Sequence, residues 1–218
     1  MSYPIKINFE TEWFPILLIL ASFGLAWYFY AHFPTVVVSH WNFEGQPDGY
    51  MGKLWAAVLI PLMLVFVYLL LLVLPMLDPM KDRYHEFEKI YRTFRNLLLF
   101  ALLVIYEIIG LANLGYHISI SKTIPIIVGL LFIVMGFLMP KIKRNWFVGI
   151  RTPWAISSEN VWDKTQALGG KLFMIFGVVV ILTPFLGRVL GIILFLTGLA
   201  IAVLGSVIYS YILYRREI

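Results

Sequence analysis

The sequence contains no cysteine and few charged residues. The absence of cysteine excludes disulfides, thiolate metal sites and cysteine nucleophiles. Only 13% of the 218 residues are charged, whereas 61% are hydrophobic, and the mean hydropathy is +0.88. This composition leaves too little polar surface to enclose a soluble core, so we expect apolar side chains to face lipid. The chain is therefore predicted to be an integral membrane protein.

Stretches that are nearly free of charge recur along the chain. They cover residues 13–30, 54–77, 97–115, 124–139, 172–186 and 189–213. Most of them approach the roughly 20 residues needed to cross the hydrocarbon core of a bilayer. The fifth is short and contains Pro184, which favours a tight hairpin with the sixth. The predicted fold class is an all-α membrane protein, a bundle of six transmembrane helices with a short interfacial cytoplasmic helix and a compact extracellular loop.

The basic residues predict the orientation. Of the 17 lysines and arginines, all but Lys53, Lys122 and Arg188 fall on the side that would hold both termini. Cytoplasmic flanks of membrane proteins carry the excess of lysine and arginine. We therefore expect a multi-pass protein of the cell membrane with both termini in the cytoplasm. Because the basic residues lie in short loops and not on one soluble face, direct nucleic acid binding is not expected.

The predicted spans divide the chain into three segments. Residues 1–80 hold two spans and an extracellular loop at residues 32–53. Residues 81–123 hold a cytoplasmic amphipathic helix and the third span, and residues 124–218 hold the last three spans with a cytoplasmic motif loop at residues 140–171.

The amphipathic helix is predicted from the spacing of its aromatic residues. Tyr84, Phe87, Tyr91 and Phe94 follow one another at three- and four-residue steps, and charged residues fill the positions between them. One such pair, Glu88 and Arg92, lies one helical turn apart and is expected to interact.

The extracellular loop contains a turn signal and several polar side chains. Its β-branched run, Val36–Trp41, favours an extended strand, and the proline and glycine that follow favour a turn. The candidate binding residues of this loop are His40, Trp41, Asn42, Gly45, Pro47, Asp48, Gly49 and Tyr50. His40, Glu44 and Asp48 recur every four residues, but metal ligands at that spacing require a helix, which Gly45 and Pro47 disfavour. No metal site is therefore predicted.

The cytoplasmic motif loop contains tryptophans, basic residues and helix breakers. Its candidate lipid- or partner-binding residues are Asn145, Gly149, Arg151, Thr152, Pro153, Trp154, Trp162, Lys164, Thr165 and Lys171. Ser157 is expected to cap a short interfacial helix from Ser158 to about Leu168, and Gly169-Gly170 to turn the chain into the fifth span. Trp146, Trp154 and Trp162 are expected at the depth of the lipid headgroups. The loop is either an interfacial belt or a docking surface for a cytoplasmic partner.

Two intramembrane polar residues, Glu107 and Asn113, lie in the third predicted span. An ionised carboxylate costs about 2.5–3.5 kcal/mol at the centre of a bilayer, so Glu107 should be protonated or face a partner inside the bundle. Tyr106, Asn113 and Tyr116 are its candidate neighbours. The carboxyl group either belongs to a functional polar pocket or makes a structural hydrogen bond between helices.

The last span has small residues at a seven-residue spacing. Gly191, Gly198 and Gly205 place them on one stripe, which predicts a face for close helix packing.

The motif loop resembles the signature of the SdpI family of membrane proteins. The resemblance covers roughly residues 124–214 and is carried by Pro140-Lys141, Asn145, Gly149 to Trp154, Trp162, Thr165 and Gly170-Lys171. The outer loop, with His-Trp-Asn followed by Pro-Asp-Gly-Tyr, resembles a short domain of unknown function that commonly precedes the SdpI region. The sequence departs from the family pattern at Gln166-Ala167, so no role is predicted for these two residues.

The family resemblance implies an immunity and signalling function. It suggests protection against a secreted peptide toxin, which would meet the outer loop, and capture of a cytoplasmic repressor at the membrane, with the loop around Arg151 as its docking surface. A transporter centred on Glu107 is the alternative. We find no metalloprotease motif and no nucleophile beside a base, so no catalytic residue, no cofactor and no enzymatic activity are predicted.

Overall fold

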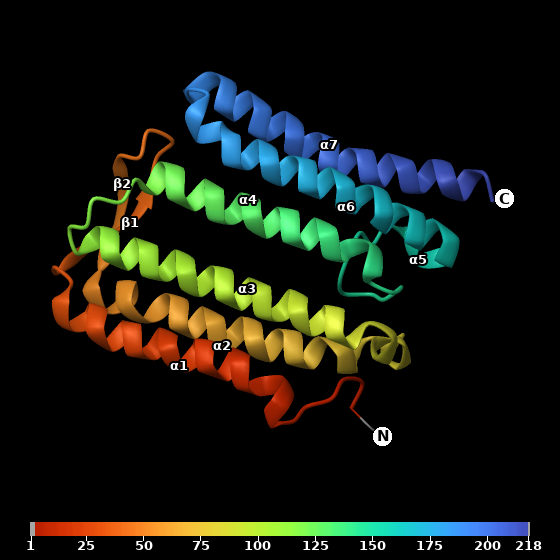
Figure 1. Ribbon diagram of the computed structural model, residues 1–218, viewed down its shortest axis with the longest axis horizontal. Coiled ribbons are helices and arrows are strands. Elements are labelled where there is room, and N and C mark those ends of the chain that lie inside the picture. The colour runs from red at the N-terminus through yellow and green to blue at the C-terminus, as the bar shows by residue number, and fades with distance from the viewer. Residues whose placement is uncertain (1–2, 218) are drawn as a thin grey trace.

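The computed structural model describes residues 3–217, which form a bundle of long helices with one small sheet (Figure 1). The main elements are α1 (Phe9–His32), β1 (Val36–Trp41), β2 (Pro47–Gly52), α2 (Lys53–Leu77), α3 (Tyr84–Asn113), α4 (Ile120–Leu138), α5 (Pro153–Ser157), α6 (Glu159–Leu182) and α7 (Arg188–Arg215). Short 3-10 turns at Lys81–Arg83, Met139–Lys141 and Thr183–Phe185 adjoin α3, α4 and α6. Six helices, α1, α2, α3, α4, α6 and α7, are long and apolar enough to cross a membrane, which confirms the predicted all-α bundle of six spans.

The helices form two halves that meet at α3 and α4. In the N-terminal half, α1, α2 and α3 contact one another, and Phe29 of α1 packs edge-on against Tyr106 of α3 at 5.2 Å between ring centroids. In the C-terminal half, α6 lies between α4 and α7 (Figure 1). Inside the bundle, α3 and α4 make the direct contact between the halves. The third span therefore packs with the first two.

All loops that carry candidate residues lie at the two ends of the bundle. The hairpin of β1 and β2 lies at one end, which we call the hairpin end. Of the predicted motif loop at residues 140–171, only residues 142–152 are irregular in the structure, and the name motif loop is used for them from here on. They lie at the opposite end together with the first and last described residues, Tyr3 and Glu217 (Figure 1). Both ends of the described chain thus share one side of the bundle, as predicted.

The predicted interfacial helix from Ser158 to Leu168 is wrong. This segment is the first half of α6, which continues through Gly169 and Gly170 to Leu182 without a break. Ser158, and not Ser157, caps the helix, since its Oγ accepts a hydrogen bond from the Val161 amide at 3.3 Å. The short helix at this end is instead α5.

Glycines allow α4 and α6 to approach closely. Gly170 therefore serves as a contact point within a continuous helix and does not form a turn. A Cβ atom on Gly136 would lie 2.5 Å from the carbonyl oxygen of Gly170, and a Cβ atom on Gly129 would lie 2.5 Å from that of Gly177. Each helix contributes two glycines seven residues apart, so the backbones touch twice along one seam. This contact was not predicted from the sequence.

The predicted packing stripe of α7 faces α6. A Cβ atom on Gly198 would lie 3.0 Å from the ring of Phe176, and one on Gly205 would lie 3.4 Å from Leu172. Gly191 is buried and lies against the carbonyl group of Thr183. The stripe is thus a packing face, as predicted, although it meets side chains more than backbone.

The predicted amphipathic helix is the first part of α3. Tyr84, Phe87 and Tyr91 are almost completely buried. The helix bends at Phe87, where φ is −134° and ψ is 22°. Glu88 and Arg92 pair at 3.6 Å, as expected. The aromatic side of this segment packs against the motif loop and α6, in one cluster with Ile142, Val148 and Trp162.

The glycine contact between α4 and α6 yields a test of the fold. We expect Gly136→Ala to lower the free energy of unfolding by about 1–3 kcal/mol, because the new methyl group would overlap the Gly170 carbonyl oxygen. Thermal unfolding in detergent, followed by tryptophan fluorescence, measures the loss. Gly24→Ala in α1 is the control, since nothing lies within 4 Å of its Cβ position, and it should be neutral or slightly stabilising. Equal unfolding midpoints for the two variants would contradict this packing.

Candidate functional site: the loops at the two ends of the bundle

The hairpin end carries a compact antiparallel hairpin, as predicted. Val38 of β1 pairs with Tyr50 of β2. Between the strands, the side-chain oxygen of Asn42 accepts hydrogen bonds from the amides of Glu44 and Gln46, both at 3.0 Å. Gly45 follows with φ of +78°, a conformation that favours glycine. The turn therefore lies at residues 42–46 and is built around Asn42 and Gly45. The predicted turn residues Pro47 and Gly49 belong to β2, so the predicted position of the turn is wrong.

Asn113 joins this hairpin to the N-terminal half. Its Oδ1 accepts a hydrogen bond from the Val38 amide at 2.8 Å, and its Nδ2 donates to the Val38 carbonyl oxygen at 3.0 Å. The side chain thus satisfies both backbone groups of a residue in β1, as a neighbouring strand would. Asn113 anchors the hairpin, and does not belong to a pocket around Glu107.

The tip of the hairpin reaches the C-terminal half. Glu44 accepts a hydrogen bond from Arg188 at the start of α7, at 2.7 Å. Gly45 lies against the start of α4, where its Cβ position is only 2.8 Å from the hydroxyl oxygen of Ser121. The hairpin therefore contacts both halves of the bundle.

The remaining polar residues of the hairpin do not converge on one point. His40 Nδ1 lies 2.5 Å from Asp48 Oδ1 across the two strands, whereas Glu44 turns to Arg188. Among residues 3–217, no group of three or more histidine, aspartate or glutamate side chains is placed to hold a metal ion.

The surface of the hairpin is aromatic and exposed. Tyr50 is 61% exposed and Phe43 is 69% exposed. Trp41 and Gly49 are half-buried, while Pro47 is exposed. Exposed aromatic side chains on a loop that is fixed at both ends are typical of binding surfaces.

At the opposite end, Asn145 organises the motif loop. It is completely buried, and its Oδ1 accepts hydrogen bonds from the amides of Phe147 at 2.8 Å and Val148 at 2.7 Å. Its Nδ2 donates to the carbonyl oxygens of Lys143 at 2.8 Å and Val148 at 3.0 Å. One amide thus satisfies four backbone groups that no regular element pairs.

Gln166 fixes the next turn of the motif loop. From α6 it accepts a hydrogen bond from the Ile150 amide at 3.1 Å and donates to the Ile150 carbonyl oxygen at 3.0 Å. Gly149 has φ of +104°, and its Cβ position lies 2.9 Å from Gln166 Oε1, so this position requires glycine. No role was predicted for Gln166. The signal for it was its place on the buried face of α6 beside Trp162 and Thr165.

The end of the motif loop is bonded to α7. Thr152 caps α5 by accepting a hydrogen bond from the Ala155 amide at 3.1 Å, and its hydroxyl group donates to Ser210 at 2.8 Å. Pro153 follows at the first position of α5, where a missing amide hydrogen costs nothing. The ring of Trp154 packs against Tyr211 at 5.0 Å between centroids.

Only part of the predicted tryptophan belt lies at the surface. Trp146 is 45% exposed, but Trp162 is completely buried and donates from Nε1 to the Ile142 carbonyl oxygen at 2.8 Å. The expectation of headgroup depth is therefore wrong for Trp162. Its indole ring instead fills the core cluster that joins α3 to α6.

The carboxylate of Asp78 connects the motif loop to the N-terminal half. One oxygen accepts hydrogen bonds from the Trp146 amide at 2.9 Å and the Tyr84 hydroxyl group at 3.0 Å. The other accepts from the Met80 amide at 2.7 Å, and the side chain is 2% exposed. No role was predicted for Asp78 from the sequence.

A second link between the halves is ionic. Arg83, beside the start of α3, pairs with Glu159 at the start of α6 and with Glu86 at 3.1 Å. Glu217 is bonded to the start of α6 by uncharged groups, since the Ser158 hydroxyl group and the Asn160 side-chain amide both donate to its carboxylate. These hydrogen bonds lower the pKa of the Glu217 carboxyl group.

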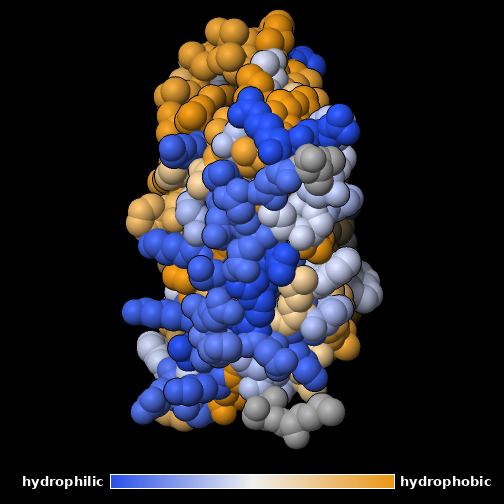
Figure 2. Space-filling view, turned by 90° about the vertical axis from the view of Figure 1, so that its right-hand side faces the viewer, coloured by the Kyte–Doolittle hydropathy of each residue, from blue (hydrophilic) through white to orange (hydrophobic). Residues whose placement is uncertain are grey.

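Few motif residues remain free to meet lipid or a partner. Arg151, Pro153, Lys164 and Lys171 are exposed, and Arg151 donates a hydrogen bond to the Trp146 carbonyl oxygen at 3.0 Å. Thr165 is buried, and its hydroxyl group has no hydrogen-bond partner among the described residues. The space-filling view of this end shows a surface rich in hydrophilic residues (Figure 2).

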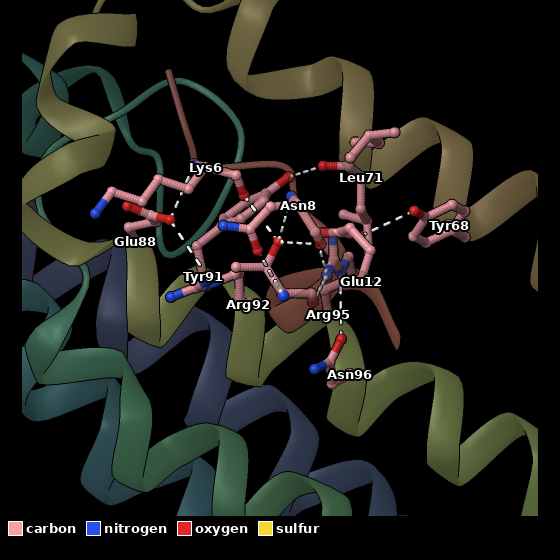
Figure 3. Close-up of polar contacts among 12 residues, drawn as sticks. Lys6, Asn8, Glu12, Tyr68, Leu71, Glu88, Tyr91, Arg92, Arg95 and Asn96 are labelled. Atoms are coloured by element: carbon pink, nitrogen blue, oxygen red, sulfur yellow. Dashed lines mark hydrogen bonds and ion pairs between the residues drawn. The ribbon is translucent and has the colours of Figure 1, made fainter. Parts of the chain in front are cut away.

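A buried ion pair lies in the N-terminal half near the motif end (Figure 3). Arg95 of α3 is completely buried and its Nη1 lies 3.0 Å from Oε2 of Glu12 in α1. The hydroxyl group of Tyr68 in α2 donates to the same carboxylate at 2.9 Å, and its ring lies 5.3 Å from the guanidinium carbon. Three helices thus meet at one charge pair. From the sequence, Arg95 was expected only to be one of the basic residues that set the orientation of the chain in the membrane.

Glu107 does not face the interior of the bundle, so the alternative that it meets a partner there is wrong. Its side chain is exposed on the outward side of α3. The predicted neighbours are engaged elsewhere, since Tyr106 is buried and donates to the Ala57 carbonyl oxygen at 2.6 Å, and Asn113 binds Val38. Consecutive residues of a helix point about 100° apart, so the burial of Tyr106 turns Glu107 outward.

Comparison with known proteins agrees with the resemblance seen in the motif. Residues 141–210 match the SdpI/YfhL protein family, and residues 17–65 match a domain of unknown function, DUF1648. Over 203 residues the chain is 25% identical to "Immunity protein SdpI" of Bacillus subtilis (strain 168). This alignment covers 92% of this chain and 94% of that protein. No solved structure matches the chain.

The buried ion pair yields a second test. We expect Glu12→Leu and Arg95→Leu each to destabilise the protein by about 3–5 kcal/mol, because each leaves an unpaired charge in the core. The double variant should be more stable than either single one, since it removes both charges. Unfolding in detergent measures all three. Arg92→Leu on the same helix is the control and should cost at most about 1 kcal/mol, because its pairing with Glu88 is partly exposed. A double variant as unstable as the sum of the single losses would contradict this interpretation.

Proposed function

We propose that this chain, a multi-pass membrane protein of the SdpI/YfhL family, is an immunity protein that binds a secreted antimicrobial peptide at its hairpin end. We further propose that peptide binding changes the motif loop at the other membrane surface, where a cytoplasmic transcriptional repressor docks. The first step rests on the similarity to an immunity protein along nearly the whole chain. The second rests on how the two loops are attached.

The observation that carries this proposal is that both loops contact both halves of the bundle. At the hairpin end, Asn113 holds the hairpin on α3, and Glu44 holds its tip on α7. At the motif end, Asp78 and Arg83 of the N-terminal half bind Trp146 and Glu159 of the C-terminal half. A ligand that changes the fit between the halves outside therefore alters contacts made by the motif loop inside. Such coupling requires that the ligand binds two arrangements of the protein with different affinity.

The hairpin offers suitable chemistry for a peptide. Phe43 and Tyr50 supply exposed aromatic surface, and the side chains of Glu44 and Arg188 are 46% and 64% exposed. A peptide with apolar and charged groups could contact both kinds of residue without burying an unpaired charge.

The motif end supplies the surface for the cytoplasmic partner. The exposed side chains of Arg151, Lys164 and Lys171 give it a positive character. An acidic surface on the partner would match these charges, and lipid phosphates would match them in the absence of a partner.

Transport centred on Glu107 has less support. This carboxyl group lies on the outward side of α3, and Asn113 is bonded to the hairpin. These two residues therefore do not line a common path through the bundle.

The immunity function is tested in the native host. A strain that lacks the gene should lose viability in spent medium from the parent strain, because the secreted peptide is no longer bound, and the restored gene should rescue survival. Colony counts after exposure measure the effect. Glu44→Lys should rescue poorly, and the combination with Arg188→Glu should recover rescue, because it rebuilds the ion pair in reverse. Both side chains are exposed, so stability should change little. A deletion strain that survives as well as its parent would show that the chain is not an immunity protein.

The signalling step has a separate test. Arg151→Gln removes an exposed charge of the motif loop and should leave survival in spent medium unchanged, while abolishing the change in transcription that the medium induces in the parent strain. RNA sequencing before and after exposure measures this change. Lys89→Gln, an exposed lysine of α3 outside the motif, should behave like the parent protein. Normal induction in the Arg151→Gln strain would rule out this docking surface.

A further inference from the structure

Two prolines interrupt the backbone hydrogen bonds of α2. An α-helix pairs each amide with the carbonyl oxygen four residues earlier, and proline has no amide hydrogen. Pro61 therefore leaves the Ala57 carbonyl group without its helical donor, and Pro75 does the same to Leu71. Ala57 and Leu71 are both buried in a helix long and apolar enough to cross a membrane. Each carbonyl group therefore needs another donor from the protein.

Tyrosine hydroxyl groups of α3 supply both missing donors. Tyr106 donates to the Ala57 carbonyl oxygen at 2.6 Å, and Tyr91 donates to that of Leu71 at 2.5 Å (Figure 3). Among residues 3–217, one further tyrosine hydroxyl group donates to a backbone carbonyl group. It belongs to Tyr3 and binds the carbonyl group next to that of Leu71. All three hydroxyl groups thus bind α2 at or beside a position that a proline leaves open.

The spacing of these residues matches along the two helices. Pro61 and Pro75 lie 14 residues apart on α2, and Tyr91 and Tyr106 lie 15 residues apart on α3. At about 1.5 Å per residue, each interval measures roughly 22 Å. The two helices run in opposite directions between the hairpin end and the motif end (Figure 1). As a result, α3 satisfies α2 at both interruptions.

Prolines elsewhere are satisfied in other ways. The Val180 carbonyl group, which Pro184 leaves free at the end of α6, accepts a hydrogen bond at 2.8 Å from Thr183, beside the proline. The carbonyl group that Pro15 leaves free in α1 lies 3.4 Å from Nη2 of Arg95. Within the described part of the chain, hydroxyl groups from a second helix bridge prolines only in α2.

The same helix joins the two loops directly. β2 ends at Gly52 and α2 begins at Lys53, so no linker separates the hairpin from this helix. At its other end, α2 is followed by Asp78, whose carboxylate accepts a hydrogen bond from the Trp146 amide of the motif loop at 2.9 Å. Both prolines lie between these two points, and Pro75 is three residues before Asp78. A displacement of the hairpin therefore reaches the motif loop along α2 only where the segments beside each proline stay aligned.

We propose that the hydroxyl groups of Tyr106 and Tyr91 keep the three segments of α2 aligned, and that α2 is the route by which the hairpin acts on the motif loop. The role in signalling rests on the proposed function, whereas the replacement of the missing donors does not. Loss of a hydroxyl group leaves a buried carbonyl group unpaired at a turn where proline already removes the helical bond. The two tyrosines are 2% and 1% exposed, so they position α2 and do not contact a ligand.

Paired substitutions in the purified protein test the replacement of the donors. Tyr91→Phe should lower the unfolding midpoint in detergent by several degrees, and Pro75→Ala should reduce this loss, because the new amide at position 75 donates to the Leu71 carbonyl group. Tyr106→Phe and Pro61→Ala should show the same relation. The crossed pairs, Tyr91→Phe with Pro61→Ala and Tyr106→Phe with Pro75→Ala, are the controls and should show independent losses. Matched pairs that are no more coupled than the crossed pairs would overturn the role of the hydroxyl groups.

Transcription in the native host tests the route through α2. Tyr91→Phe should leave survival in spent medium unchanged and reduce the transcriptional change that the medium induces several-fold. Tyr68→Phe removes a hydroxyl group that donates to Glu12 and not to a backbone carbonyl group, so this matched control should respond like the parent protein. Normal induction in the Tyr91→Phe strain, an equal reduction in both strains, or loss of survival together with induction would overturn the route.

The two experiments separate this inference from the proposed function. A parent strain without any induced change would refute the proposed signalling and with it the route through α2. Coupling within the matched pairs, measured without a ligand or a cytoplasmic partner, would still show that Tyr91 and Tyr106 replace the donors that the prolines lack.

Discussion

The motif end depends on side chains that satisfy the backbone of an irregular loop. A loop at the edge of the hydrocarbon region cannot leave its amide and carbonyl groups unpaired. Asp78, Asn145 and Gln166 meet this requirement from three different elements, and all three are almost completely buried. Asp78 makes the widest set of contacts. Its carboxylate accepts hydrogen bonds from Trp146 in the motif loop, from Tyr84 at the start of α3 and from Met80 in the turn that follows Asp78. Side chains therefore pair the backbone groups of the motif loop, as neighbouring strands pair those of a strand, although the loop contains no regular structure.

Two different kinds of contact join the halves of the bundle at its two ends. The core cluster at the motif end includes Tyr84 and Tyr91 from α3 together with Val161 and Trp162 from α6. At the hairpin end, residues 114–119 connect α3 directly to α4, and an ion pair and a close contact at the tip of the hairpin add to this connection. The halves are thus joined by buried side chains at one end and by the chain itself, together with the hairpin, at the other.

The fold could be predicted from the sequence because hydrophobic length alone identifies a span. The six nearly charge-free runs correspond to the six long helices, and the β-branched run Val36–Trp41 is the expected strand. The turn lies at Asn42 and Gly45, and not at Pro47 and Gly49 as expected. The predicted ends of helices were wrong where one residue type occurs in two structural contexts. Gly169-Gly170 was interpreted as a turn, but glycine also permits close helix packing, and only the position of Gly136 on α4 decides between the two.

The site was less predictable because its contacts join residues that are distant in sequence. Asp78 and Trp146 lie 68 residues apart, and Glu12 and Arg95 lie 83 apart. No local pattern links such pairs. Glu107 was misplaced for a related reason, since composition shows that a carboxyl group is in the span but not toward which side of α3 it points. The burial of its neighbours gave the answer.

The geometry also separates the family signature from the residues that are free to recognise a ligand. Asn145, Gly149, Thr152 and Trp162 carry the resemblance, yet each is used to hold the motif loop in place. The residues that keep exposed surface are Phe43 and Tyr50 at the hairpin end and Arg151 at the motif end, where only one guanidinium nitrogen is bonded to the loop, at the Trp146 carbonyl oxygen. Relatives that share the signature can thus share this scaffold while their ligands differ.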